Sequence, residues 1–196
     1  MGMNELSICR PNVKFFDNTQ TTAMHIKNYY KAVQRGAGDA EVIGCNTIGH
    51  LVAGIHSAQR VGFDVSGRSF EWTRRYGVNS FMRLAQNGTF FNVDPDCAPF
   101  TERVPLSLSL DFLEICALTG MTTLASVTPD ILSGSEMKRI NDIYKLASKG
   151  GSNYKIADYQ NTCCPDKFIS EDGKDIKEYD WYSYYNGVRN KLSWKN

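Results

Sequence analysis

The feature of this sequence that most constrains its fold is an alternation of short apolar runs with helical segments between about residues 19 and 150. Repetition of strand and helix predicts a parallel sheet with helices outside it, which is the α/β class. The apolar or β-branched runs that we expect to form strands are 40–46 (AEVIGCN), 59–67 (QRVGFDVSG), 88–94 (GTFFNVD) and 121–132 (MTTLASVTPDIL). The helical segments, each of which closes on glycine, are 19–38, 69–88, 105–120 and 133–151.

Polar residues predict where each helix begins, because their side-chain oxygens can accept a hydrogen bond from the first helical turn. The predicted starts are Thr19, Thr21 or Thr22 for the first helix, Ser69 for the second, Ser109 for the third and Ser135 for the fourth.

The four strand–helix units are half the number in a closed (β/α)8 barrel of the TIM type. We therefore divide the chain into a partial barrel at 1–150 and, at 151–196, a linker with the start of a C-terminal β-domain that has a hairpin turn at 171–174. A half barrel would expose two unpaired edge strands, so we expect the chain to self-associate or to pair with another half barrel.

The composition favours an ordinary soluble protein, since 42% of the 196 residues are hydrophobic and the formal net charge is +1. This balance predicts no nucleic-acid partner and no membrane partner. No secretion signal is evident, so the sequence favours the cytoplasm, although a segment preceding this chain could carry such a signal. The six scattered cysteines form no Cys-x-x-Cys pair and no nucleotide-binding motif occurs, so we expect no metal and no cofactor; Cys163 and Cys164 have no assigned role.

Chemically active side chains follow several of the predicted strands, where the active sites of parallel α/β folds lie. Cys45, Asp64, Asp94 and Asp96 occupy such positions. Arg60 precedes Asp64 by four residues, and on one strand both side chains would face the same way. The pair could therefore line a pocket or form a structural ion pair, and Asp94 and Asp96 could bind a ligand or simply shape a turn.

Taken in order, the segments VIGCN, QRVGFDVSG, WTRRYGVNSFM, FFNVDPDC and LTGMTTLASVTPDIL resemble the second half of the catalytic barrel in α-galactosidase (melibiase)-like glycoside hydrolases, family thirty-six in particular. The resemblance covers about residues 19–150. Its strongest element is NVDPDC, which is similar to the Asn-Asp-Pro-Asp-Cys signature of the seventh strand with Val93 interposed.

This resemblance implies retaining hydrolysis of an α-linked galactoside, or of a related glycan, as the function. It implies that Asp64 is the general acid/base, and that the substrate-binding residues are Arg60, Cys45, Asp94, Asp96 and Ser126. Such a mechanism uses a second carboxylate, the nucleophile, about 5–5.5 Å from the acid/base.

The family's nucleophile lies in a Lys-x-Asp motif after the fourth strand, and this chain has no such motif before Cys45. Its nearest counterpart is Lys14 with Asp17, where Asp17 also fits the start of the first helix. We therefore expect a fragment or relative that lacks its N-terminal half and is inactive alone. The alternatives are a non-catalytic sugar-binding or interaction module and an unrelated α/β protein with a small-molecule site.

Overall fold

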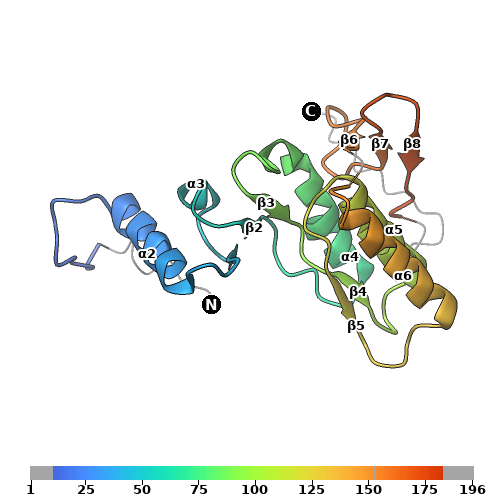
Figure 1. The fold of residues 1–196 in the computed structure, drawn as a ribbon, viewed down its shortest axis with the longest axis horizontal. Coiled ribbons are helices and arrows are strands. Elements are labelled where there is room, and N and C mark those ends of the chain that lie inside the picture. Colours follow the sequence, from blue (N-terminus) through green and yellow to red (C-terminus); the bar gives the residue numbers. More distant parts are fainter. Residues whose placement is uncertain (1–10, 152, 183–196) are drawn as a thin grey trace. The chain divides into compact units, whose positions relative to one another are not determined.

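The computed structural model describes residues 11–151 and 153–182. The chain forms two compact units, each built from two stretches of sequence. Unit 1 consists of Met1–Val61 and Ala85–Asp94, and unit 2 of Gly62–Leu84 and Pro95–Asn196. Figure 1 labels the helices and strands of both units.

The longest helix among the described residues of unit 1 is α2 (Thr22–Ala37). The hydroxyl of Thr21 accepts a hydrogen bond from Met24 N at 3.3 Å, so this residue is the N-cap among the three predicted candidates. The helix ends at Gly38, whose φ of 60° is readily adopted by a residue without a Cβ. The first predicted helix is therefore confirmed.

The sheet of unit 1 contains three parallel strands in the order β1-β2-β3. They are β1 (Ile43–Gly44), β2 (Ala58–Arg60) and β3 (Asn92–Asp94), and the short helix α3 (Gly49–Val52) lies between the first two in sequence. The register places Arg60 opposite Asp94, so β2 and β3 end at the same edge. The buried side chains of Val52, Phe91 and Val93 form much of the core around these strands.

A helical segment opens unit 2 and changes its type along its length. It consists of α4 (Phe70–Trp72), a π-helical turn (Thr73–Gly77) and a 3-10 helix (Val78–Gln86). Ser69 caps it by accepting from Glu71 N at 3.2 Å, which confirms the predicted start. Gly77 is in close contact with the core, because a Cβ added there would lie 2.7 Å from Phe112 Cζ.

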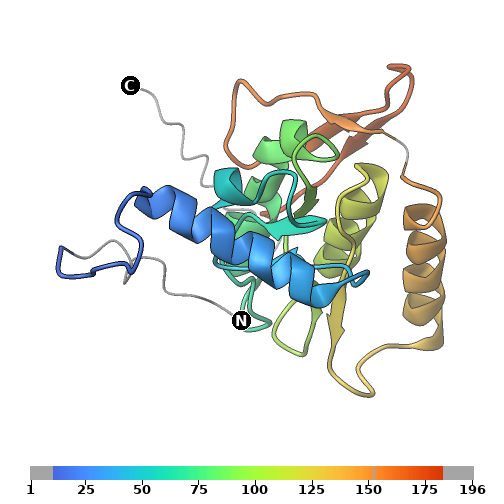
Figure 2. The same cartoon turned by 60° about the vertical axis from the view of Figure 1, so that its left-hand side comes forward.

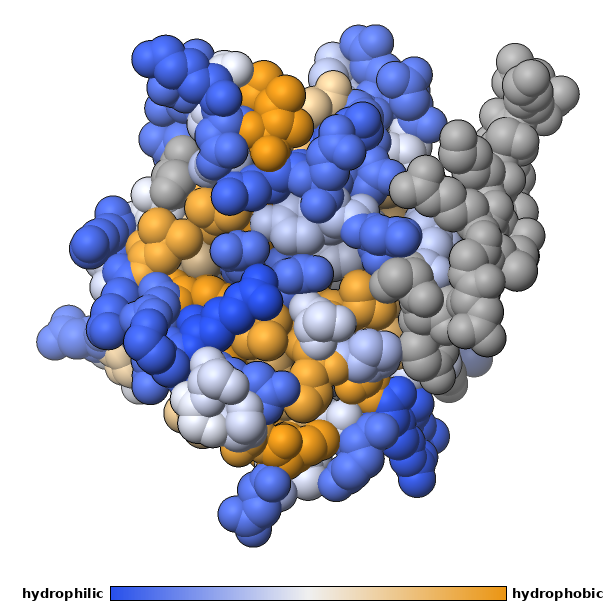
Figure 3. Space-filling model, turned by 90° about the vertical axis from the view of Figure 1, so that its right-hand side faces the viewer, coloured by the Kyte–Doolittle hydropathy of each residue, from blue (hydrophilic) through white to orange (hydrophobic). Residues whose placement is uncertain are grey.

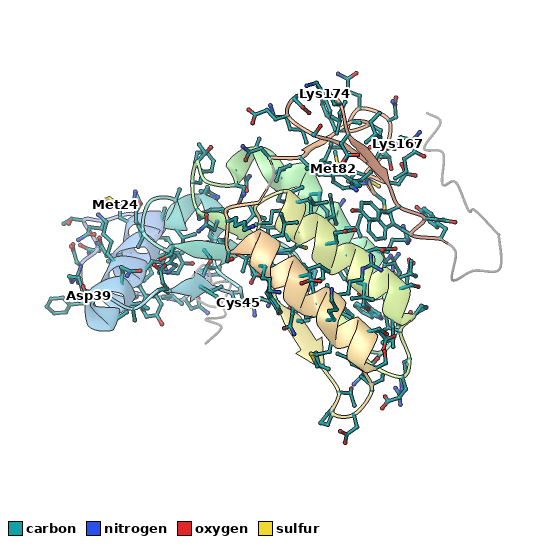
Figure 4. The ribbon with its side chains drawn as sticks, turned by 45° about the vertical axis from the view of Figure 1, so that its right-hand side comes forward. Met24, Asp39, Cys45, Met82, Lys167 and Lys174 are labelled. Atoms are coloured by element: carbon teal, nitrogen blue, oxygen red, sulfur yellow. The ribbon has the colours of Figure 1, made fainter. Side chains whose placement is uncertain are left out.

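The second parallel sheet pairs β4 (Ala98–Phe100) with β5 (Ala125–Val127), and α5 (Leu106–Leu118) connects the two strands. Most side chains of α5 are buried, whereas Ser107, Asp111 and Glu114 form a more exposed stripe along it. The helix α6 (Gly134–Ala147) packs beside α5, as the views in Figures 1 and 4 show.

Three antiparallel strands close the described part of unit 2: β6 (Lys155–Ile156), β7 (Lys167–Ile169) and β8 (Ile176–Glu178). Figure 2 shows β7 and β8, in red, side by side. The predicted turn at 171–174 joins them and is confirmed. Lys167 and Lys174, labelled in Figure 4, are exposed on these elements, whereas Phe168 is buried and meets the ring of Phe81 edge-on at 5.3 Å.

The predicted α/β class is confirmed at the level of parallel β–α units followed by a small antiparallel sheet, and the described strands do not form a closed barrel. The domain boundary at residue 150 stays a prediction. Two predicted helix starts were wrong. The third helix begins at Leu106, before Ser109, and the fourth is capped by Ser133, which forms a capping box with Glu136.

All four predicted strands were too long. The observed strands that correspond to these runs are Ile43–Gly44, Ala58–Arg60, Asn92–Asp94 and Ala125–Val127. The strand β4 was not predicted, because Asp-Pro-Asp and Pro99 are residues typical of turns and edges.

No helix among the described residues combines the length and the apolar character needed to cross a membrane. Hydrophobic side chains nevertheless reach the surface. On the face drawn in Figure 3 they appear in groups, in orange, among hydrophilic residues in blue. Such a distribution is common on soluble proteins and does not by itself mark a binding site.

Candidate functional site

The carboxyl edge of the unit 1 sheet carries three of the predicted site residues. Arg60 is the last residue of β2 and Asp94 the last residue of β3. Cys45 directly follows β1; its thiol is free and half-buried, and Figure 4 labels it. Because the three strands are parallel, these residues leave the sheet at the same edge.

Arg60 and Asp94 form an ion pair in which Nε lies 3.1 Å from Oδ2. The Asp94 side chain is 1% exposed and that of Arg60 is 16% exposed. A carboxylate buried this deeply requires a cation or several donors, since the loss of hydration is otherwise not offset. The ion pair considered from the sequence joined Arg60 to Asp64, whereas this one joins Arg60 to Asp94.

A second polar contact supports this edge from inside the sheet. Gln59 is 1% exposed; its Oε1 accepts from the Thr47 hydroxyl and its Nε2 donates to Arg60 O at 2.6 Å. Gly44 leaves space for this amide, because a Cβ there would lie 2.2 Å from Gln59 Oε1. Sequence reasoning missed Gln59 and Thr47. No pattern in the sequence signalled them, since Gln59 stands beside the charged Arg60 in a strand of three residues.

Asp64 lies in a loop, four residues beyond the end of β2, and its side chain is exposed. The prediction that Arg60 and Asp64 share one strand was therefore wrong, and strand alternation says nothing about their directions. The chain leaves β2 through Gly62, where a Cβ would lie 2.7 Å from Tyr76 O. Such a close approach of two backbones is open only to glycine.

Asp96 is buried and occupies the left-handed region with a φ of 76°. Its Oδ2 accepts from Val65 N at 2.7 Å and its Oδ1 accepts from Cys97 N at 2.7 Å. Within unit 2, Asp96 is therefore hydrogen-bonded to Val65, the residue that follows Asp64. The carboxylate engages backbone groups of two separate loops.

Ser126 is the middle residue of β5, opposite Pro99, and is exposed. The resemblance implies a sugar-binding role for this residue, which lies one residue before the end of β5.

Asp17 precedes α2 and is engaged in a local turn. Its Oδ1 accepts from Thr19 N and Oγ1, and its Oδ2 from Gln20 Nε2. The hydrogen bond from the Thr19 hydroxyl is the main cause of a lowered pKa for the Asp17 carboxyl. The residue stays ionised, as a nucleophile must, but its oxygens serve the start of the helix.

His56 is a buried group of unit 1 that the sequence did not single out. Its ring is 5% exposed and lies edge-on to Tyr30 with centroids 5.7 Å apart. Burial lowers the pKa of this imidazole, because the charged form loses its hydration. The group is structural and lies in the segment before β2.

The structure thus joins Arg60 with Asp94 in unit 1, and Asp96 with the Asp64 loop in unit 2. Within residues 11–151 and 153–182, no cluster of three or more His, Cys, Asp and Glu could hold a metal ion. The chain matches no protein-family model, and no match to it was found among curated proteins.

Proposed function

We propose that this chain is a fragment or relative of a retaining glycoside hydrolase of the α-galactosidase (melibiase) type, and that it supplies strands five to eight of a (β/α)8 barrel. In this assignment β1, β2, β3 with β4, and β5 are the four strands in order. The observation that carries the proposal is the pairing of Arg60 with Asp94 at the shared carboxyl edge of parallel strands. Barrel enzymes place substrate-contacting residues at such edges.

Asp64 is the general acid/base of this proposal. Its carboxyl donates a proton to the departing glycosidic oxygen and then removes a proton from the water that releases the sugar. A neighbouring arginine would favour the ionised carboxylate and so oppose the first step. Within unit 1, Arg60 pairs with Asp94, whose Oδ2 lies 3.1 Å from Nε.

Arg60 is the residue of this proposal that bonds sugar hydroxyls, as the resemblance implies, and its Nε bonds to Asp94. Cys45, Asp94 and Ser126 are the other substrate-contacting residues of this proposal, whereas Asp96, for which the resemblance implies the same role, accepts hydrogen bonds from Val65 N and Cys97 N. The nucleophile would come from a different segment or a different polypeptide.

A sugar-binding module without turnover is the second candidate. The observation that favours it is the local use of Asp17, whose two carboxylate oxygens accept hydrogen bonds at the start of α2. An unrelated α/β protein with a small-molecule site would also be compatible with this fold class.

The test is an assay with 4-nitrophenyl α-galactoside beside titration calorimetry with methyl α-galactoside. We expect binding without turnover, and weaker binding by the variant Arg60→Met. The matched control is Arg83→Met, which removes an exposed arginine. Turnover that is lost in Asp64→Asn would show that a nucleophile is present, and Asp17→Asn would test that residue. Absence of both binding and turnover would contradict the proposal.

The same assignment predicts association between copies. The order β1-β2-β3 leaves β1 and β3 at the edges of the unit 1 sheet, where unpaired backbone groups can bond to another strand. We expect light scattering to give a mass above that of the 22.0 kDa chain. A strictly monomeric chain at micromolar concentration would contradict this prediction.

A further inference from the structure

Asp96 has an unusual backbone conformation for a residue with a side chain. Its φ of 76° lies in the left-handed region, and it is 7% exposed. Aspartate tolerates this region better than most residues, but the conformation still disfavours folding and persists only where surrounding contacts hold it. The question is what the conformation achieves.

The Asp96 carboxylate accepts hydrogen bonds from the backbone N–H groups of Cys97 and Val65. One stays local, since Oδ1 accepts from the next residue, Cys97. The other reaches 31 residues back along the chain, where Oδ2 accepts from Val65 N at 2.7 Å. Bonds from a backbone N–H to a carboxylate are stronger than those between neutral groups.

The Val65 N–H belongs to the peptide plane that also contains the carbonyl and Cα of Asp64. A bond that holds this plane therefore limits the rotation of the backbone on the C-terminal side of Asp64. Val65 itself is 1% exposed, and its Cγ1 is 3.3 Å from where a Cβ on Gly77 would lie. The residue after Asp64 is thus anchored both by hydrogen bonding and by packing.

The rest of the loop is anchored at its two ends. Gly62 lies against Tyr76 O, as described above, and Gly67 O accepts from the Thr101 hydroxyl at 2.6 Å. Between these anchors the side chain of Asp64 is exposed while its backbone is held by Asp96. The Asp64 side chain is therefore exposed on a loop whose backbone is held by the Asp96 carboxylate.

We propose that Asp96 is a positioning residue, which orients the loop carrying Asp64 through the Val65 N–H instead of contacting the sugar itself. The role of Asp64 as acid/base rests on the proposed function. The anchoring of its loop by Asp96 does not, so the two parts can fail separately.

The experiment compares Asp96→Asn with Asp96→Gly by NMR on the full chain. Asparagine keeps an acceptor oxygen and tolerates a left-handed φ, whereas glycine relieves the backbone but removes the acceptor. We expect hydrogen exchange at the Val65 amide to accelerate at least about tenfold in Asp96→Gly. In Asp96→Asn it should stay close to that of the unmodified chain, and the Asp64 carboxyl signal should move only in the glycine variant.

A second measurement needs no variant and covers the case in which Asp96→Gly does not fold. In the unmodified chain, the Val65 amide proton should shift upfield when acid protonates the carboxylate it bonds to, and this shift should vanish in Asp96→Asn. The Gly67 amide serves as the control within the same loop. The positioning role would be overturned by a Val65 amide signal that does not change with pH. It would also be overturned by equal hydrogen exchange at Val65 in the unmodified chain, Asp96→Asn and Asp96→Gly.

Sugar titration separates this proposal from the proposed function. If methyl α-galactoside shifts Asp64 signals and Asp96→Asn binds as the unmodified chain does, positioning is supported. If binding is lost in Asp96→Asn while Val65 exchange is unchanged, Asp96 contacts the sugar directly and the positioning role is wrong. If no sugar binds but Val65 exchange still depends on Asp96, the anchoring stands and the proposed function fails.

Discussion

The interiors of the two units differ in the kinds of side chain that they bury. Unit 1 buries an ion pair, an amide and an imidazole, contributed by Asp94, Gln59 and His56, which bond or pack against residues far away in sequence. Unit 2 is dominated by large rings, and apart from Asp96 its buried polar side chains are serines and threonines, among which Ser80, Ser109 and Thr119 donate to backbone oxygens. Its fully buried aromatic residues are Phe70, Phe81, Phe100, Phe112, Phe168 and Trp181.

The difference indicates which perturbation each unit resists. Apolar packing depends on volume and is nearly insensitive to pH, whereas buried polar contacts depend on charge and on every partner staying in place. Unit 2 should therefore respond most to loss of side-chain volume, and unit 1 to loss of a charge or a change in pH.

The largest effect is expected for Phe112→Ala. The ring is fully buried, meets Phe81 edge-on at 6.1 Å and fills the space beside Gly77. Its removal leaves a cavity, and we expect the free energy of unfolding to fall by about 4 kcal/mol. Urea denaturation measures this change in the free energy of unfolding. The control Phe63→Ala removes a ring that is 73% exposed and should change stability by less than about 0.5 kcal/mol.

A smaller effect is expected for Asp94→Asn, which removes the buried charge beside Arg60. Breaking a buried pair leaves one charge without its partner, and we expect a loss of about 3 kcal/mol. The double variant Arg60→Met/Asp94→Leu should recover most of this stability, since neither charge is then buried. Asp142→Asn, on an exposed pair with Lys138, serves as the control and should have little effect. Equal losses of stability in Asp94→Asn and Asp142→Asn would contradict the expected difference between a buried and an exposed ion pair.

The smallest effect is the pH dependence from His56. Burial lowers the pKa of this imidazole below its ordinary value of about 6.5, so between the two values the unfolded chain binds more protons. Its contribution to stability is complete above pH 6.5 and is lost as the pH falls through the folded-state pKa. Denaturation at several pH values should show this decline, and His56→Phe should reduce it. His50→Phe, at an exposed position, should not.

Part of the fold was predictable because it is encoded in local patterns. The caps at Thr21 and Ser69, and the hairpin between β7 and β8, depend on residues within a few positions of one another. The strand β4 was not predictable in this way. It forms because Ala98 and Phe100 are buried and pair with β5, which outweighs the turn preference of the prolines around them.

The site was predictable as a set of positions but not as a set of partners. Sequence order placed Asp94 at a strand end and Arg60 within a neighbouring predicted strand, yet their contact depends on the register of β2 against β3. The Arg60–Asp64 strand hypothesis failed because Gly62 turns the chain away from the sheet geometry. The bond from Val65 to Asp96 depends on a left-handed φ, and no periodicity in the sequence signals it.

The two glycines that bound the Asp64 loop also limit how the loop can change during evolution or engineering. A Cβ on Gly62 would collide with a backbone oxygen, and one on Gly67 would lie 2.4 Å from Thr101 Cγ2. Variation compatible with the fold is thereby directed to the exposed positions between them, above all Phe63. A library that diversifies Phe63 while keeping both glycines should therefore retain folded variants more often than one that also varies Gly62 or Gly67.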